Sequence, residues 1–98
     1  MIASFSIVPL DQGESVSEHV ALCLSLVQES GLPYQLTPMA TVVEGEMDAV
    51  LGLISRCHRA LRERSRRVLT RIEIDDREGR EDALHSKVES VRSRLQDM

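Results

Sequence analysis

The stretch YQLTPMATVVEG, residues 34–45, contains two short runs of β-prone residues, 34–37 and 41–44. A Pro-Met-Ala segment separates the two runs, so the stretch predicts a β-hairpin with a short loop. A glycine ends the second run. A helix is expected from about Glu46, because acidic side chains in a first turn suit the helix dipole.

Alternating residues predict one strand before this hairpin and one after it, at 2–8 and 67–75. Three helices are predicted from apolar residues at helical spacing. Ser15 caps the first helix, Glu18 completes a capping box, and Gly31 ends the helix. Leu22 and Leu26 fall off its apolar face, either as ordinary exposed leucines or as part of a subunit contact. The expected apolar faces are Val16, Val20, Cys23, Leu24 and Val27 in the first helix; Met47, Val50, Leu51, Ile54, Cys57, His58 and Leu61 in the second; and Leu84, Val88, Val91 and Leu95 in the third, which covers about 81–96.

The order βαββαβ followed by a helix predicts an α+β, ferredoxin-like sandwich that spans residues 1–98 as a single domain. Right-handed crossovers place two helices on one face of a four-stranded antiparallel sheet. That face is expected to hold Phe5, Ile7, Ile72 and Ile74. The opposite face mixes polar and apolar side chains, which suits a subunit interface or a wet ligand pocket; its members are Ser4, Ser6, Arg71 and Glu73 with Ile2, Val8 and Leu69.

Charge is distributed unevenly along the chain. Residues 1–55 contain seven acids and no Lys or Arg, whereas the remainder holds all 12 basic groups and the other nine acids. The basic groups alternate with acids and only two aromatic residues are present, so nucleic-acid binding is not expected. No basic n-region and no run of roughly 20 apolar residues occurs, which predicts a cytoplasmic protein without a membrane partner. Cys23 and Cys57 are then expected to be free thiols.

Catalytic and metal-binding patterns are lacking. His19, His58 and His85 have no second ligand at metal-site spacing, so each is expected to be a satisfied or exposed imidazole. No phosphate-binding glycine loop occurs. Asp75-Asp76 is read either as a metal or acid/base pair or as a structural turn with Arg77. No catalytic residue, metal or cofactor is predicted.

Four segments together resemble the YkoF-like thiamine-binding protein family: SIVP at 6–9, SVSEHV at 15–20, SGLPYQLTPMATVVEG at 30–45 and RIEIDDR at 71–77. The resemblance is collinear and covers nearly the whole chain. It implies a ferredoxin-like fold, dimers that assemble into tetramers, and a pocket for thiamine or its hydroxymethylpyrimidine part. The turn after Pro9 is longer than is usual in this family, and the resulting loop is expected to border the pocket.

The residues themselves suggest how such a ligand is held. Thiamine is a permanent cation with an aminopyrimidine ring, which favours a carboxylate, hydroxyl acceptors and an aromatic or apolar wall. Glu44 is the predicted carboxylate, although it is alternatively a cap for the second helix. Tyr34 is the predicted wall or a core-edge tyrosine, and Thr41 a ligand or a plain strand residue. The predicted ligand-binding set is Glu44, Thr41, Thr37, Ser4, Ser6 and Tyr34.

The predicted function is therefore non-catalytic binding of thiamine or its hydroxymethylpyrimidine part by a homodimer or homotetramer. Two alternatives stay open. One is a structural or regulatory interaction module without a small-molecule ligand. The other is a dimeric ferredoxin-like enzyme of the monooxygenase or isomerase type, which would need a His, Tyr or Arg poised in the pocket.

Overall fold

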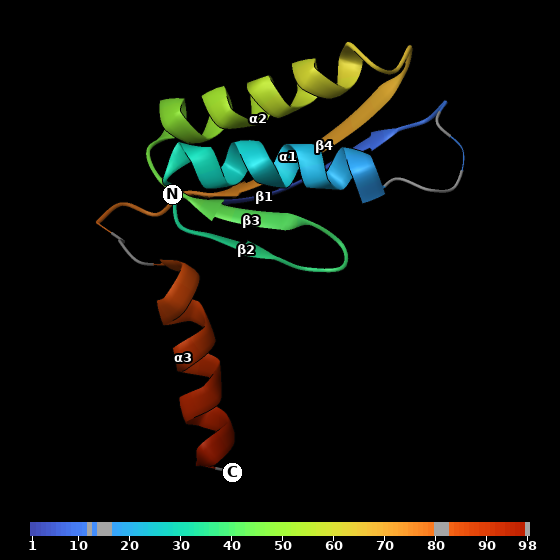
Figure 1. Ribbon diagram of the computed structural model, residues 1–98. Coiled ribbons are helices and arrows are strands. Elements are labelled where there is room, and N and C mark those ends of the chain that lie inside the picture. The colour runs from blue at the N-terminus through green and yellow to red at the C-terminus, as the bar shows by residue number, and fades with distance from the viewer. Residues whose placement is uncertain (12, 14–16, 80–82, 98) are drawn as a thin grey trace.

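The computed structural model describes residues 1–11, 13, 17–79 and 83–97. Its elements confirm the predicted order (Figure 1). Of the two residues predicted to cap the first helix, Ser15 lies outside the described residues. Glu18 lies in the first turn of that helix. The elements are β1 (Ile2–Pro9), α1 (Ser17–Ser30), β2 (Tyr34–Leu36), β3 (Thr41–Glu44), α2 (Met47–Arg62), β4 (Val68–Asp75) and α3 (Ala83–Gln96).

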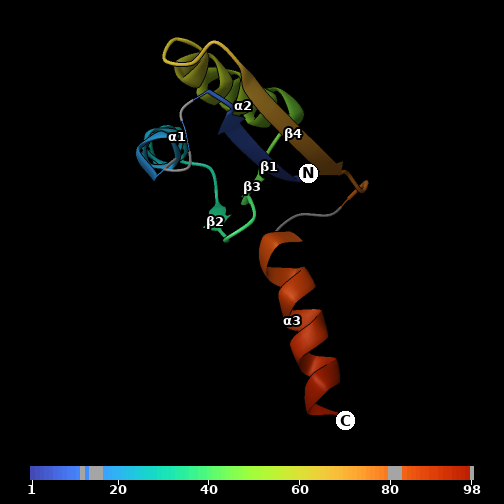
Figure 2. The same ribbon diagram turned by 90° about the vertical axis from the view of Figure 1, so that its right-hand side faces the viewer.

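The four strands form one antiparallel sheet in the order β2-β3-β1-β4. Figure 2 shows α1 and α2 together on one side of this sheet. The ferredoxin-like α+β fold is thus confirmed. β1 is central, and its two neighbours cover it unequally: β4 pairs with all of Ile2–Pro9, whereas β3 pairs only with residues 2–5.

The hydrophobic core lies between the sheet and the two helices that cover it. Ala3, Phe5 and Val43 contribute from the sheet, and Val27 contributes from α1. α2 supplies the largest share because five of its side chains are buried. Those five are Val50, Leu53, Ile54, Cys57 and Leu61.

The predicted apolar face of α2 is wrong at one side of the helix. Met47 and Leu51 were expected in the core but are exposed, whereas Leu53, which was not expected there, is fully buried. His58 Nδ1 lies 2.6 Å from Thr70 Oγ1, so this side of α2 faces β4. β4 is the last strand of the sheet, and in the described chain nothing beyond it covers that side of the helix.

α1 differs from its prediction for a similar reason. Val20 was expected on the core face but is exposed, and Leu26, expected off that face, packs against the core. Val16 lies outside the described residues. The buried stripe of α1 is therefore rotated from the predicted one toward α2 and the sheet.

Ile72 and Ile74 also depart from their prediction. Both share the helix-covered face, since they pair with the core residues Phe5 and Ala3. They are nevertheless 44% and 40% exposed. The edge position of β4 explains this exposure, because only its inner side lies under α2.

α3 projects away from the rest of the fold, on the side of the sheet opposite α1 and α2 (Figure 2). Leu84 in its first turn is buried, whereas Val88, Val91 and Leu95 along the predicted stripe are exposed. None of the helices in the described residues is long and apolar enough to cross a lipid bilayer.

Candidate functional site

A cavity of about 210 Å³ lies among α1, the β2–β3 hairpin and β1. Its wall is mostly apolar, with hydroxyl-bearing residues on the hairpin side. The lining residues are Phe5, Ser6, Ile7, Val8, Val20, Cys23, Leu36, Thr37, Pro38, Met39, Ala40 and Thr41.

The cavity exists because β1 is longer than the ladder it shares with β3. Phe5 pairs with Thr41 at the end of that ladder, yet β1 continues to Pro9. The edge of β1 that faces the hairpin is therefore not covered by a strand at residues 6–8. In an antiparallel sheet, alternate residues of a strand direct their N–H and C=O groups toward the same edge, so this edge offers hydrogen bonds to an occupant of the cavity.

Thr37 shapes the hairpin loop at the rim of the cavity. Its Oγ1 donates a hydrogen bond to the carbonyl of Ala40 at 2.8 Å and accepts from the backbone amides of Met39 and Ala40. The backbone amide of Thr37 also donates to the Ala40 carbonyl, at 2.9 Å. With its hydroxyl engaged three times, Thr37 supports the loop that carries Pro38 and Met39.

The structure brings three of the six predicted site residues to this cavity: Ser6, Thr37 and Thr41. Ser6 lies between Phe5 and Ile7 in the strand, so its side chain points to the opposite face and its backbone borders the cavity. Thr41 pairs with the core residue Phe5 and therefore points to the helix side. Among the described residues, no hydrogen-bond partner is found for the Thr41 hydroxyl.

The other three predicted residues lie elsewhere. Tyr34 is at the far end of β2, where its hydroxyl accepts a hydrogen bond from Gln28 Nε2 of α1 at 3.1 Å. Ser4 is on the sheet face opposite the helices, where it lines a hollow of about 160 Å³ with Glu73 and Asp75. The predicted set is thus divided between two faces of the sheet.

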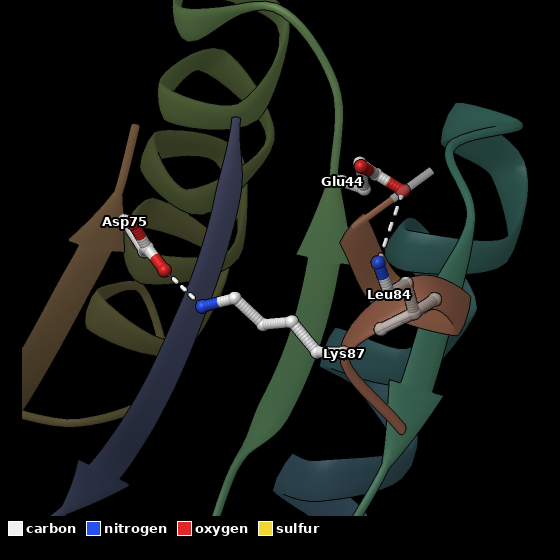
Figure 3. A network of polar contacts seen from close by, with 4 residues as sticks. All are labelled: Glu44, Asp75, Leu84 and Lys87. Carbon is white, nitrogen blue, oxygen red and sulfur yellow. Dashed lines mark hydrogen bonds and ion pairs between the residues drawn. The ribbon is translucent and has the colours of Figure 1, made fainter. Parts of the chain in front are cut away.

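Glu44 is buried beside the first turn of α3 (Figure 3). Its Oε1 accepts a hydrogen bond from the backbone amide of Leu84 at 3.4 Å. An acidic group near a helix N-terminus is favourable because the amides there carry partial positive charge. A second contact holds the start of α3, since Lys87 forms an ion pair with Asp75 at the end of β4. Asp75 is therefore engaged with α3, and in the described residues it belongs to no metal-binding cluster.

None of the described side chains that line the cavity carries a formal charge. Cys23 is the only one of these side chains that can ionise. Cys57 Sγ of α2 donates a hydrogen bond to the carbonyl oxygen of Cys23 at 3.7 Å. The interaction between the two neighbouring thiols raises the pKa of Cys23 and lowers the pKa of Cys57. Both cysteines are free thiols, as predicted.

The three histidines do not converge on the cavity. His58 contacts Thr70 and His85 is exposed. His19 departs from its prediction because it is buried and its Nδ1 has no partner in the described part of the chain. Within that part, no group of three or more His, Cys, Asp or Glu side chains is arranged to hold a metal.

The lining residues that sequence reasoning missed include Val20, Cys23, Leu36 and Met39. Met39 lies in the predicted loop and Leu36 in the strand just before it, so their place in the hairpin could have indicated their role. The loop after Pro9 was expected to border the pocket. Most of this loop, residues 12 and 14–16, lies outside the described residues, and its described residues Leu10 and Asp11 do not line the cavity.

The fold and the cavity define a small ferredoxin-like protein with a ligand-sized pocket beside its hairpin. The sequence model of the thiamine-binding protein family matches residues 3–92, and the chain belongs to this family. Its relatives include the UPF0045 protein YqgV of Bacillus subtilis, which is 39% identical over 97% of both chains.

Two solved structures share the fold of this chain. The crystal structure of hypothetical protein MJ1052 from Methanocaldococcus jannaschii is 29% identical, has a TM-score of 0.87, and is matched over 92% of this chain and 93% of that one. A domain of unknown function, DUF77, from Bacillus cereus is 32% identical with a TM-score of 0.79, over 89% of this chain and 85% of that one.

Proposed function

We propose that this protein is a non-catalytic binding protein for thiamine or its hydroxymethylpyrimidine part, with the pyrimidine ring in the cavity between α1 and the hairpin. Membership of the thiamine-binding protein family supports the ligand class. The observation that carries the location is the open edge of β1 at residues 6–8, which faces an otherwise apolar cavity.

The size and charge of the cavity favour the pyrimidine ring over the thiazolium ring. Its volume of about 210 Å³ is below the roughly 300–1,000 Å³ of drug-sized ligand sites, so one ring fits better than two. A permanent cation would lose hydration in a wall without a carboxylate, which is costly. The neutral aminopyrimidine instead needs donors and acceptors, and these are supplied by strand backbone and by the Thr41 hydroxyl.

Glu44 and Ser4 belong to a second version of the site, in which the ligand lies on the helix-free face of the sheet and Glu44 balances the cationic charge. Tyr34 fits neither version, because it pairs with the core residue Val43 and so lies on the helix side, away from the cavity. Glu44 already accepts a hydrogen bond from α3, and Tyr34 already contacts Gln28. These existing contacts make the cavity version the stronger one, and the two versions predict different mutants.

Thr41→Val is expected to weaken binding of both thiamine and hydroxymethylpyrimidine by about 2- to 12-fold. The substitution keeps the side-chain shape and removes one hydroxyl, and a hydrogen bond contributes about 0.5–1.5 kcal/mol. Calorimetric titration of each compound into wild type and mutant measures the change.

Glu44→Gln is the matched comparison for Thr41→Val. In the cavity version it leaves both affinities within twofold or so of wild type, since Glu44 does not line the cavity. A selective loss of thiamine affinity in Glu44→Gln, with Thr41→Val unchanged, would move the site to the outer face. Wild-type protein that binds neither compound would favour the interaction-module alternative.

We also infer that the chain assembles with copies of itself. α3 exposes Val91 at 58% and Leu95 at 63%, and it contacts the body mainly through its first turn. A helix of 14 residues is only marginally stable when it has no partner. A second copy that covers the Val88, Val91 and Leu95 stripe would supply the missing packing.

Val91→Asp is accordingly expected to lower the particle mass from a multiple of 11.0 kDa toward the monomer, because it places a charge in the apolar contact. Light scattering at micromolar concentration measures the mass. Ser93→Asp is the control, since Ser93 lies on the opposite side of α3 and should leave the mass unchanged. A wild-type protein that is already an 11.0 kDa monomer would refute the inference.

A further inference from the structure

α2 turns one side away from the rest of the fold. The helix lies at the outside of the molecule, with α1 beside it and the sheet beneath it (Figure 1). Its five buried side chains point toward those neighbours, so the opposite side is open. Four residues spaced i, i+4, i+7 and i+11 share this open side, which we call the α2 face. They are Asp48, Gly52, Ser55 and Arg59; Ser55 is half-buried and the other three are exposed.

The α2 face carries opposite charges at its two ends. Asp48 lies in the first turn of the helix and Arg59 in the last. Within the described part of the chain, neither side chain forms an ion pair. The middle of the face holds only the small residues Gly52 and Ser55. One end of the face therefore attracts a cation, the other attracts an anion, and nothing bulky stands between them.

Gly52 has no evident role within its own chain. A Cβ added at this position would have no heavy atom within 4 Å, apart from the local backbone of the helix, and the backbone here is not left-handed. Glycine in an exposed helix interior is less favourable than alanine. It does allow another backbone to approach closely. A second helix packed across Gly52 would account for a glycine at this place.

We propose that the α2 face binds the same face of a second copy of this chain, in an antiparallel helix pair about a twofold axis. Asp48 and Arg59 are equally distant in sequence from a point between Leu53 and Ile54, and so are Gly52 and Ser55. A twofold axis through that point brings each Asp48 level with Arg59 of the second copy. The same axis places the small residues opposite each other, where the two helices approach.

Charge complementarity selects a second copy as the occupant of this face. A polyanion would meet the like charge of Asp48, and a polycation would meet the like charge of Arg59. The antiparallel copy meets an opposite charge at both ends. The proposal does not depend on which ligand occupies the cavity.

The α2 contact is separate from the contact inferred on α3, because α2 and α3 lie on opposite sides of the sheet (Figure 2). One chain can therefore use both. Two different twofold contacts on each chain build an assembly of four chains. Loss of either contact alone leaves pairs of chains.

The test reverses the charges at the two ends of the face. Asp48→Arg and Arg59→Asp each place like charges opposite each other, which should weaken the α2 contact roughly 100-fold or more. The double variant with both substitutions restores opposite charges, so it should recover the contact. Sedimentation equilibrium over micromolar to millimolar concentration measures the masses, and circular dichroism confirms that each variant is folded. Four chains are expected for wild type and for the double variant, and two for each single variant.

Two further variants separate a contact between copies from an effect on the helix itself. Glu18→Arg removes the acid from the first turn of α1, outside the α2 face, and should leave the mass unchanged. Gly52→Leu adds a side chain for which the chain itself has room and which favours a helix. It should therefore preserve the helical circular dichroism while lowering the mass as Asp48→Arg does.

The outcomes distinguish the two contacts. A mass that neither single variant changes would overturn the α2 proposal, as would a wild-type mass in Gly52→Leu or a double variant that recovers nothing. Variants that respond as expected while Val91→Asp keeps the wild-type mass would support the α2 contact and overturn the α3 inference. A wild-type protein that is still a monomer at millimolar concentration would overturn both.

Discussion

Replacing Val20 with tryptophan is expected to weaken binding of hydroxymethylpyrimidine by about 5- to 150-fold. Val20 lines the cavity from α1, yet its side chain is partly in solvent, so the larger ring can enter the cavity without disturbing the core. A ligand that must then displace or overlap the indole meets a steric cost of about 1–3 kcal/mol, as for overpacked sites. Calorimetric titration of wild type and mutant measures the loss.

Ala21→Trp is the matched control for this mutant. Ala21 is the next residue of α1, is exposed and does not line the cavity, so its replacement adds the same ring outside the site. Both mutants should melt close to wild type, since exposed helix positions tolerate substitution within about 0.5 kcal/mol. Unchanged affinity in Val20→Trp, or an equal loss in Ala21→Trp, would show that the ligand does not occupy this cavity.

Leu53→Ala is expected to lower the free energy of unfolding by about 2–5 kcal/mol. Leu53 is 0% exposed in the core between α2 and the sheet, and removal of its methyl groups leaves a cavity that the packed neighbours fill only in part. Because total stability is of the order of 5–15 kcal/mol, this loss is large, and the melting temperature should fall by roughly 10 °C or more. Urea denaturation followed by circular dichroism measures the change.

Leu51→Ala provides the comparison on the same helix. Leu51 is 37% exposed on the side of α2 that faces the edge strand, so the same truncation should cost about 1 kcal/mol or less. The periodicity of the sequence predicts the opposite ranking, because it assigns Leu51 to the core and omits Leu53. A larger loss from Leu51→Ala than from Leu53→Ala would favour that assignment over the packing seen in the structure.

Local signals were sufficient for the elements and their order. The hairpin at 34–44 follows from two β-prone runs around a short loop, and the flanking strands follow from alternation over residues 2–8 and 67–75. Each of these patterns acts within a few residues, so no distant contact is needed to read it. The order of the elements and the preferred crossover handedness then lead to the ferredoxin-like fold.

The faces of the helices required more than periodicity. Apolar residues of α2 cover a wide arc, from Leu53 on one side to Leu51 on the other, and a helical repeat alone does not say which part of such an arc faces the sheet. The part of the arc that is buried is determined by the position of α2, which lies over β1 and the inner side of β4. This position buries Leu53 and leaves Leu51 and Met47 beside the uncovered edge.

The candidate site was only partly predictable. The sequence alone places Thr37 and Thr41 on one hairpin, and both do line the cavity. It could not show that Glu44 and Ser4 face the other side of the sheet, because this depends on which alternate strand positions are covered by helices. It also could not show that Glu44 would lie under the first turn of α3, a contact between residues 40 positions apart.

By itself, the sequence determined the secondary structure, the fold and membership of the thiamine-binding protein family, since all three rest on local patterns and their order along the chain. The tertiary structure alone decided the cavity and the contact between Cys57 and the backbone of Cys23. The cavity arises where the ladder with β3 stops at Phe5 while β1 runs on to Pro9, and the cysteines meet because α1 and α2 pack side by side. Both depend on distances between elements remote in sequence, which no local pattern encodes.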